Sequence, residues 1–127
     1  MKRLFRNATL INEGRSFTAS LLTSGAQIEK IYEGTDTFPE ALLSEVDELV
    51  PAEGLWLLPG CIDDQVHFRE PGLTHKATIE SESQAAIAGG TTSFMEMPNT
   101  KPPTTSLEAW QWKKDRAGET SWANYSF

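Results

Sequence analysis

Short runs of alternating hydrophobic and polar residues mark the first part of the chain, and such alternation is typical of half-buried β-strands. Four segments between residues 1 and 58 have this character: Lys2–Phe5, Ser16–Leu22, Gln27–Tyr32 and Leu55–Leu58. Turn-forming pairs separate them, namely Glu13-Gly14, Ser24-Gly25 and Glu33-Gly34. Pro39–Leu49 is acidic and only weakly periodic, which predicts a short helix or a loop. Residues 1–58 are therefore predicted to form a small β domain with hairpins.

The pattern changes after Pro59, where longer helical segments separate the β-like ones. Three strands are predicted: Ile62–Phe68, Thr91–Met97 and Ser121–Phe127. Strands that alternate with helices at this spacing are typical of parallel βαβ units, so residues 59–127 are predicted to be an α/β domain. A closed parallel barrel needs eight strands and about 250 residues. Because the sequence ends within an apparent third strand, we expect it to be a fragment of a larger protein.

Two helices are predicted between these strands. Thr78–Ala88 is rich in Ala, Glu and Gln, and Gly89-Gly90 supplies the left-handed conformation that commonly ends a helix. The second helix is expected to begin at a capping box formed by Thr105 and Glu108 and to run to about Ala117.

Polar side chains gather on one face of the first of these strands. Alternation places four of them together: Asp63, Gln65, His67 and Arg69. The opposite face contains Ile62, Asp64, Val66 and Phe68, and three of these four suit packing against helices. A hydrogen-bonded polar cluster with a structural histidine would explain this pattern, but Arg69 and the following Glu70-Pro71-Gly72 turn favour a functional site.

The second strand predicts a neighbour for this site. Asn99 follows its C-terminal end, where functional residues of parallel barrels gather. A guanidinium group beside an amide is a good receptor for a carboxylate, which makes Arg69 and Asn99 a candidate pair. An Asx-turn is the alternative role for Asn99. Glu96 falls on the helix-facing side of the strand and is expected to form a pair or cap a helix.

Charge and composition limit the possible partners. The 127 residues carry a net charge of −7, which argues against nucleic acid or an anionic membrane surface as the main partner. No apolar run is long enough for a transmembrane helix, and the first residues lack the apolar stretch of a signal peptide. We therefore expect a cytoplasmic protein.

Two segments of the sequence together resemble a known family. PGCIDDQVHFREPG (59–72) and AAIAGGTTSFMEMPNTKPPT (85–104) closely resemble the dihydroorotases of the cyclic amidohydrolase superfamily. That family typically has Asp-x-His-x-His-x-Arg-Glu/Asp-Pro-Gly in the first segment and Met-Pro-Asn-Thr in the second. The resemblance implies the start of a parallel (β/α)8 TIM-type barrel, preceded by a small β domain and truncated after the third barrel strand.

The resemblance also implies roles for individual residues. His67 corresponds to the second histidine of a pair that binds zinc, as one or two ions, and Gln65 replaces the first. Arg69 and Asn99 correspond to residues that hold the substrate carboxylate. The remaining ligands and the catalytic Asp belong to later strands, so we expect no catalytic residue in this chain and no activity from it alone.

The implied reaction is the reversible cyclisation of N-carbamoyl-L-aspartate to dihydroorotate in pyrimidine biosynthesis, with a small molecule as partner and a homo-oligomer possible. Gln65 leaves three outcomes open, because an amide oxygen is a much poorer zinc ligand than imidazole. The site could be weaker or hold one metal, Gln65 could ligate or border the metal, or the protein could be an inactive scaffold for another pyrimidine enzyme. Retention of both Arg69 and Asn99 favours an active enzyme.

Overall fold

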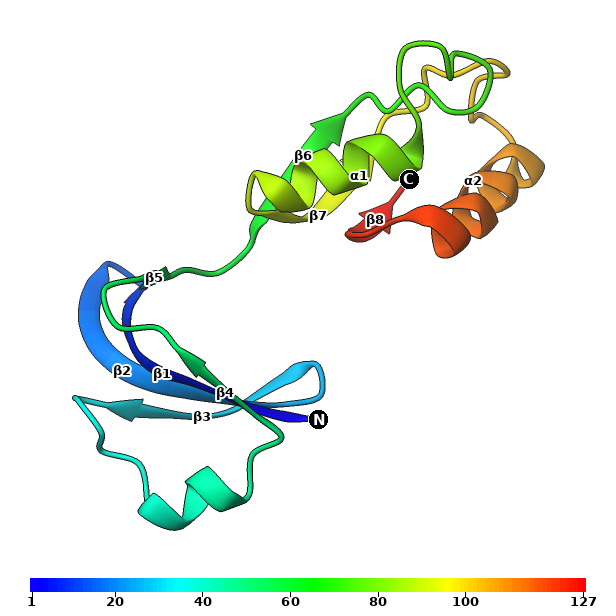
Figure 1. Ribbon diagram of the computed structural model, residues 1–127. Coiled ribbons are helices and arrows are strands. Elements are labelled where there is room, and N and C mark those ends of the chain that lie inside the picture. Colours follow the sequence, from blue (N-terminus) through cyan, green and yellow to red (C-terminus); the bar gives the residue numbers. More distant parts are fainter. The chain divides into compact units, whose positions relative to one another are not determined.

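The structure is a computed structural model that describes all residues from Met1 to Phe127. The chain forms two compact units (Figure 1): unit 1 spans Met1–Pro59 and unit 2 spans Gly60–Phe127. None of its helices combines the length and the apolar character needed to cross a membrane.

Unit 1 is a five-stranded sheet in which β1 is central. The strands are β1 (Lys2–Asn12), β2 (Arg15–Ser24), β3 (Gln27–Glu33), β4 (Glu48–Pro51) and β5 (Trp56–Leu57). β1 and β2 pair antiparallel, as do β2 and β3, which confirms the predicted hairpins. β4 and β5 both pair with β1 in parallel. One apolar cluster of this unit is Ala8, Leu10, Ala19, Leu21 and Ala52, and a second is Leu4, Leu22 and Leu42.

Strand β1 continues well beyond its predicted end at Phe5. Its register with β2 shifts between Phe5 and Ala8, and Asn7 in that gap has a φ of 56°. The buried Asn7 receives a hydrogen bond from the Ser20 hydroxyl and donates one from its Nδ2 to Asp36, at 3.3 and 3.0 Å. These bonds to residues distant in the sequence stabilise a β-bulge at Arg6 and Asn7, and β1 continues beyond it.

The segment Pro39–Leu49 differs from its prediction in its second half. A short 3₁₀ helix, η1 (Glu40–Ser44), occupies the first half, and its Leu42 is buried. The end of the segment belongs to strand β4, where we predicted none. Four residues are too few to show alternation, and the pairing with β1 is what makes this segment a strand.

Unit 2 is a parallel βαβαβ arrangement, as predicted, with strand order β6-β7-β8. Its elements are β6 (Cys61–Val66), α1 (Ile79–Ala88), β7 (Thr91–Glu96), α2 (Leu107–Thr120) and β8 (Asn124–Ser126). Both helices contribute to one core, which consists of Phe68, Ile79, Phe94, Ala117 and Ala123. The ring centroids of Phe68 and Phe94 lie 4.4 Å apart.

The ends of helix α2 differ from their predicted positions. The cap is Ser106 rather than Thr105, because the Ser106 hydroxyl accepts a hydrogen bond from the Ala109 amide at 3.2 Å. The helix also continues past Gly118 to Thr120. A Cβ at Gly118 would approach the Tyr125 hydroxyl to 3.2 Å, so this glycine allows close packing instead of ending the helix.

A buried ion pair connects α2 to the end of β7. Glu96 and Lys113 are both buried, and the Lys113 ammonium donates to Glu96 Oε2 and, at 3.3 Å, to the carbonyl of Met97. The predicted pairing of Glu96 is thereby confirmed. Burial lowers the pKa of Lys113 to about 8, so the ammonium form still predominates at neutral pH. Lys113 therefore fixes the point at which the chain leaves β7.

Replacing Lys113 by methionine should destabilise the protein strongly, because Glu96 would remain buried without its cation. We expect Lys113→Met to lower the free energy of unfolding by about 3–5 kcal/mol, measured by urea denaturation. Lys114→Met is the matched control, since Lys114 is exposed and its ammonium lies over the ring of Trp110, 5.2 Å from the ring centroid; its effect should stay within about 1 kcal/mol. Equal effects of the two substitutions would contradict this account of the pair.

Candidate functional site

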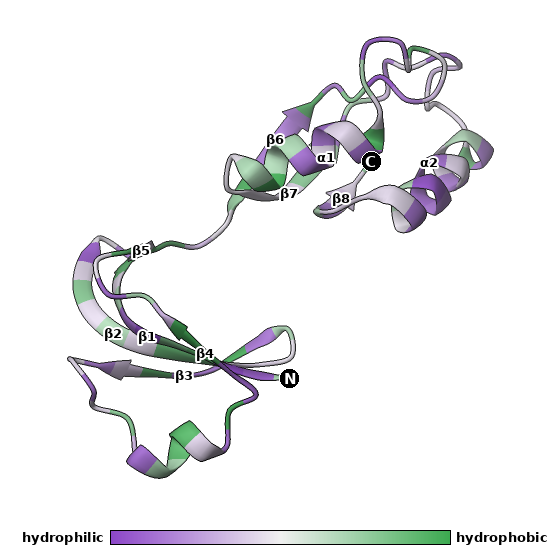
Figure 2. Cartoon of the chain, in the orientation of Figure 1, coloured by the Kyte–Doolittle hydropathy of each residue, from purple (hydrophilic) through white to green (hydrophobic).

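The polar end of strand β6 does not follow the simple alternation that the sequence suggested. The strand ends at Val66 rather than Phe68, and its register with β7 shifts between Asp63 and Val66. Such a shift changes which side chains share a face. Ile62 is 68% exposed, so its predicted packing against the helices is wrong, whereas Phe68 is in the core as expected. Figure 2 shows the hydrophilic colouring of the β6 arrowhead.

His67 and Arg69 consequently lie in the loop that follows β6 rather than on the strand. Arg69 has a φ of 71°, in the left-handed region that a non-glycine residue rarely adopts. Its carbonyl accepts a hydrogen bond from the Leu73 amide at 3.1 Å, which closes a tight turn. The backbone of Arg69 is therefore held in a defined conformation near the end of β6, with its side chain partly exposed.

The structure brings His67 and Asn99 together. His67 Nδ1 lies 2.9 Å from Asn99 Oδ1. Since an amide oxygen can only accept, Nδ1 is the donor in this contact, and in the neutral imidazole Nε2 then has the free lone pair. The same contact leaves the Asn99 amide nitrogen free to donate to a ligand. The side-chain oxygen of Asn99 thus bonds His67 instead of forming the alternative Asx-turn.

The motifs did not predict this contact; they predicted only that Asn99 and Arg69 lie on adjacent strand ends. The structure records no hydrogen bond between Arg69 and Asn99. The register of the sheet gives the reason, because Val66 pairs with Glu96 and the amide of Met97 donates to the carbonyl of Val66 at 2.9 Å. The residue after Val66 therefore lies next to the segment that leaves β7.

The loops after β6 and β7 are docked against each other (Figure 1), and they are called the two site loops below, residues 67–73 and 97–104. The Lys101 amide donates to the Pro71 carbonyl at 3.1 Å. Gly72 has a φ of 82°, and a Cβ at that position would overlap the backbone carbonyl of Lys101. Only glycine permits this approach, so the two site loops form one continuous surface.

The donors near this surface do not make a complete zinc site. His67 offers one imidazole nitrogen, and the side chain of Gln65 offers a neutral amide oxygen. The backbone N–H of Gln65 donates to Asp63 Oδ1 at 3.2 Å. No group of three or more His, Cys, Asp or Glu side chains in the chain could hold a metal ion. Protein zinc sites use three or four ligands, so the residues present fit at most one part of such a site.

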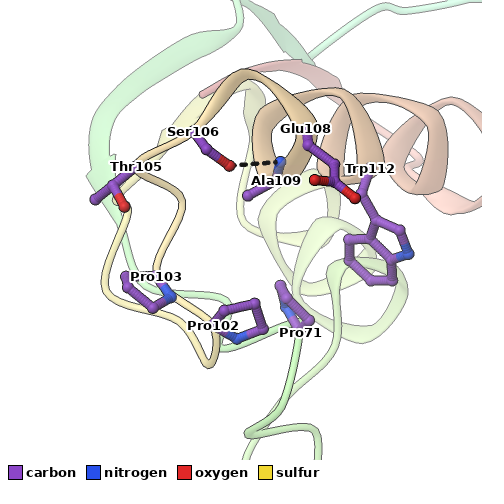
Figure 3. A pocket seen from close by; sticks show the side chains of 8 residues that line it. All are labelled: Pro71, Pro102, Pro103, Thr105, Ser106, Glu108, Ala109 and Trp112. Carbon is purple, nitrogen blue, oxygen red and sulfur yellow. Dashed lines mark hydrogen bonds between the residues drawn. The ribbon is translucent and has the colours of Figure 1, made fainter.

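A hollow of about 670 Å³ lies beside the candidate residues rather than at them. Figure 3 shows prolines from both site loops on one side of it and Glu108 and Trp112 of helix α2 on the other. Neither His67 nor Asn99 lines it. This hollow could not be predicted from the sequence, because its walls come from segments with no shared motif.

Comparisons with known proteins point to one family. The family described as Dihydro-orotase-like matches residues 54–126. A dihydroorotase from Wolbachia sp. subsp. Brugia malayi is 46% identical over 108 residues, which are 85% of this chain and 24% of that protein. The dihydroorotase of Bacillus subtilis is 36% identical over 124 residues, which are 95% of this chain and 27% of that protein.

Solved structures of related hydrolases share the fold. The L-hydantoinase (dihydropyrimidinase) of Arthrobacter aurescens matches with a TM-score of 0.84 and 27% identity, over 97% of this chain and 26% of its own. The D-hydantoinase (dihydropyrimidinase) of a Thermus species matches with a TM-score of 0.74 and 29% identity, over 98% of this chain and 26% of its own. The chain thus spans about a quarter of the length of the relatives it matches.

Replacing Gly72 by alanine should separate the two site loops. The added methyl group must displace the Lys101 carbonyl, and the left-handed backbone is unfavourable for alanine as well. Gly90→Ala is the matched control, because Gly90 has a φ of 86° but open space around it. We expect Gly72→Ala to reduce the free energy of unfolding by about 1–3 kcal/mol more than Gly90→Ala does, measured by urea denaturation. Equal losses would show that the close approach has no energetic weight.

Proposed function

Because this chain belongs to the dihydro-orotase-like family, we propose that it is the N-terminal part of a dihydroorotase, which interconverts N-carbamoyl-L-aspartate and dihydroorotate by closing or opening an amide-type C–N bond. The observation that carries the proposal is the 2.9 Å contact between His67 and Asn99 across the two site loops. It brings one residue from each of the two family motifs into a single arrangement, with Arg69 in the same loop as His67.

The proposal includes the beginning of a larger parallel barrel. Unit 2 supplies three parallel strands with a helix after each of the first two, which is the repeating unit of such a barrel. β6 and β8 each pair on one side only, so both edges are available to further strands. Coverage of about a quarter of each relative supports the same view. Unit 1 would then be the small β domain that precedes the barrel.

In this proposal the substrate carboxylate binds between Arg69 and Asn99. Arg69 offers a guanidinium group, which can bind a carboxylate with two parallel hydrogen bonds. Because Asn99 Oδ1 contacts His67, the NH₂ group of Asn99 points away from the histidine. That NH₂ group can then donate a hydrogen bond to the carboxylate that Arg69 binds. An anionic substrate therefore finds a cation and an oriented donor, although the whole chain is acidic.

We further propose that His67 supplies one nitrogen to a zinc site whose other donors, together with the catalytic base, lie outside these 127 residues. Zinc bound in such a site makes hydroxide available near neutral pH and polarises a carbonyl group. The chain's own part is to orient a donor. Asn99 holds the imidazole of His67 in one tautomer, with Nε2 exposed for a ligand.

The proposal is tested with the product of the complete coding region, which should convert carbamoyl-aspartate to dihydroorotate. Arg69→Lys should weaken substrate use by one to two orders of magnitude, because losing a charge-assisted bond to an anion costs about 1.5–3 kcal/mol, and zinc content should not change. Arg15→Lys, which alters an exposed arginine of unit 1, is the control and should leave both values unchanged. Absence of turnover in the unaltered protein would refute the proposed function.

Gln65 gives a separate prediction about the metal. Replacing it with histidine should raise the zinc affinity or the zinc content of the complete protein, because imidazole is a far better zinc donor than an amide oxygen. His67→Ala should lower both. Metal analysis of the three forms after dialysis against a mild chelator measures the effect. If neither substitution changed the zinc content, the end of β6 would not be part of a metal site.

A further inference from the structure

The carboxylate of Glu70 is buried at the centre of the first site loop and uses both of its oxygens. Glu70 is only 6% exposed. Its Oε2 accepts a hydrogen bond from the Ile79 amide at 2.8 Å, and its Oε1 accepts one from Arg116 Nε at 2.9 Å. From the sequence, Glu70 is part of a turn and of the family motif, with no predicted role of its own. In the structure it connects that turn to both helices of unit 2.

Only a carboxylate can accept both of these bonds at once, one on each oxygen. Ile79 is the first residue of α1, so its N–H has no partner within the helix, and a negative charge is favourable at that end. The pKa of the Arg116 guanidinium is raised above its ordinary value, mainly by its hydrogen bond to Glu70 and secondly by the negative charge of that carboxylate. An amide side chain has one oxygen and one NH₂ group. It would therefore have to turn a donor towards one of the two N–H groups.

Arg69 is held between two anchored neighbours. Phe68 before it is buried in the core, and Glu70 after it is fixed by its two hydrogen bonds. A non-glycine residue in the left-handed region costs about 1–3 kcal/mol and persists only where its surroundings enforce it. Arg69 is such a residue, with a φ of 71°. On its C-terminal side, the anchoring of Glu70 can enforce this conformation together with the hydrogen bond from the Leu73 amide to the Arg69 carbonyl.

We propose that Glu70 is a positioning residue for Arg69. Its carboxylate fixes the first site loop to the N-terminus of α1 and to Arg116 of α2, and thereby holds the Arg69 guanidinium where it binds the substrate anion. The part of this inference that concerns the substrate rests on the proposed function. The part that concerns the conformation of the loop does not.

The test uses Glu70→Gln in the product of the complete coding region, with two measurements. Hydrogen–deuterium exchange in residues 67–73 should become about tenfold faster, as expected for the loss of roughly 1.4 kcal/mol of local stability. The KM for carbamoyl-aspartate should rise about tenfold with kcat within about twofold, since the lost interaction is one of binding. Glu119→Gln is the matched control. Its carboxylate also faces Arg116, but at 4.0 Å and exposed, and it should change neither value.

A double-substitution cycle separates positioning from a general loss of structure. In an Arg69→Ala background, Glu70→Gln should have little further effect on kcat/KM, because the group it positions is already missing. An equal effect in both backgrounds would overturn the proposal, as would unchanged exchange in residues 67–73. If Glu70→Gln does not fold, Arg116→Met removes the cationic anchor of Glu70 and should give the same changes, at least as large because the buried carboxylate loses its cation; unchanged exchange and KM in that variant would also overturn it. A protein that exchanges faster as expected but never turns over carbamoyl-aspartate would retain the positioning role and refute the proposed function.

Discussion

Both carboxylates that unit 2 buries are neutralised by helix α2, and the arrangement of the strand ends depends on this. Glu70 pairs with Arg116, and Glu96 pairs with Lys113. An unpaired buried charge costs several kcal/mol, so neither carboxylate can remain in place unless α2 is correctly docked. The two cations are three residues apart and therefore lie on one side of the helix. A single helical face thus determines where the chain leaves β6 and where it leaves β7.

Such pairs are better understood as devices of specificity than as sources of net stability. The desolvation of two ions offsets most of their attraction, and an apolar pair of similar volume is often as stable. An apolar pair, however, forms no hydrogen bonds and so does not fix the orientation of the groups around it. Lys113 also donates to the carbonyl of Met97, and Glu70 accepts from the amide of Ile79, so each pair orients backbone as well as side chains. Orientation of backbone is what a binding site built on loops requires.

The order of the elements in unit 2 could be predicted because local patterns determine it. Helix α1 ends before Gly89 as predicted and begins one residue later than predicted, because Thr78 caps it; the terminal glycines are a local signal. Strand β1 could not be predicted past Phe5, because its continuation depends on bonds from Asn7 to distant residues. β4 was missed for the same reason, as pairing with β1 creates it.

The candidate site was predictable to a similar extent. The motifs identified His67, Arg69 and Asn99 as the residues of interest. Strand alternation, however, assigned His67 and Arg69 to one face of β6, and β6 ends at Val66, before both residues. The contact between His67 and Asn99 depends on the register of two strands, which no local pattern contains. The anchoring of Glu70 was equally hidden, because one of its partners, Arg116, follows it by 46 positions.

The docking of the two site loops also bears on how such proteins can be re-engineered. Gly72 lies against the backbone of Lys101, so the shape of either loop is complementary to the other. A loop taken from a relative and grafted alone would meet a partner with the wrong contour, however well its own residues suited a new ligand. The pair of loops, together with the face of α2 that anchors it, is therefore the smallest module that can be exchanged between members of the family.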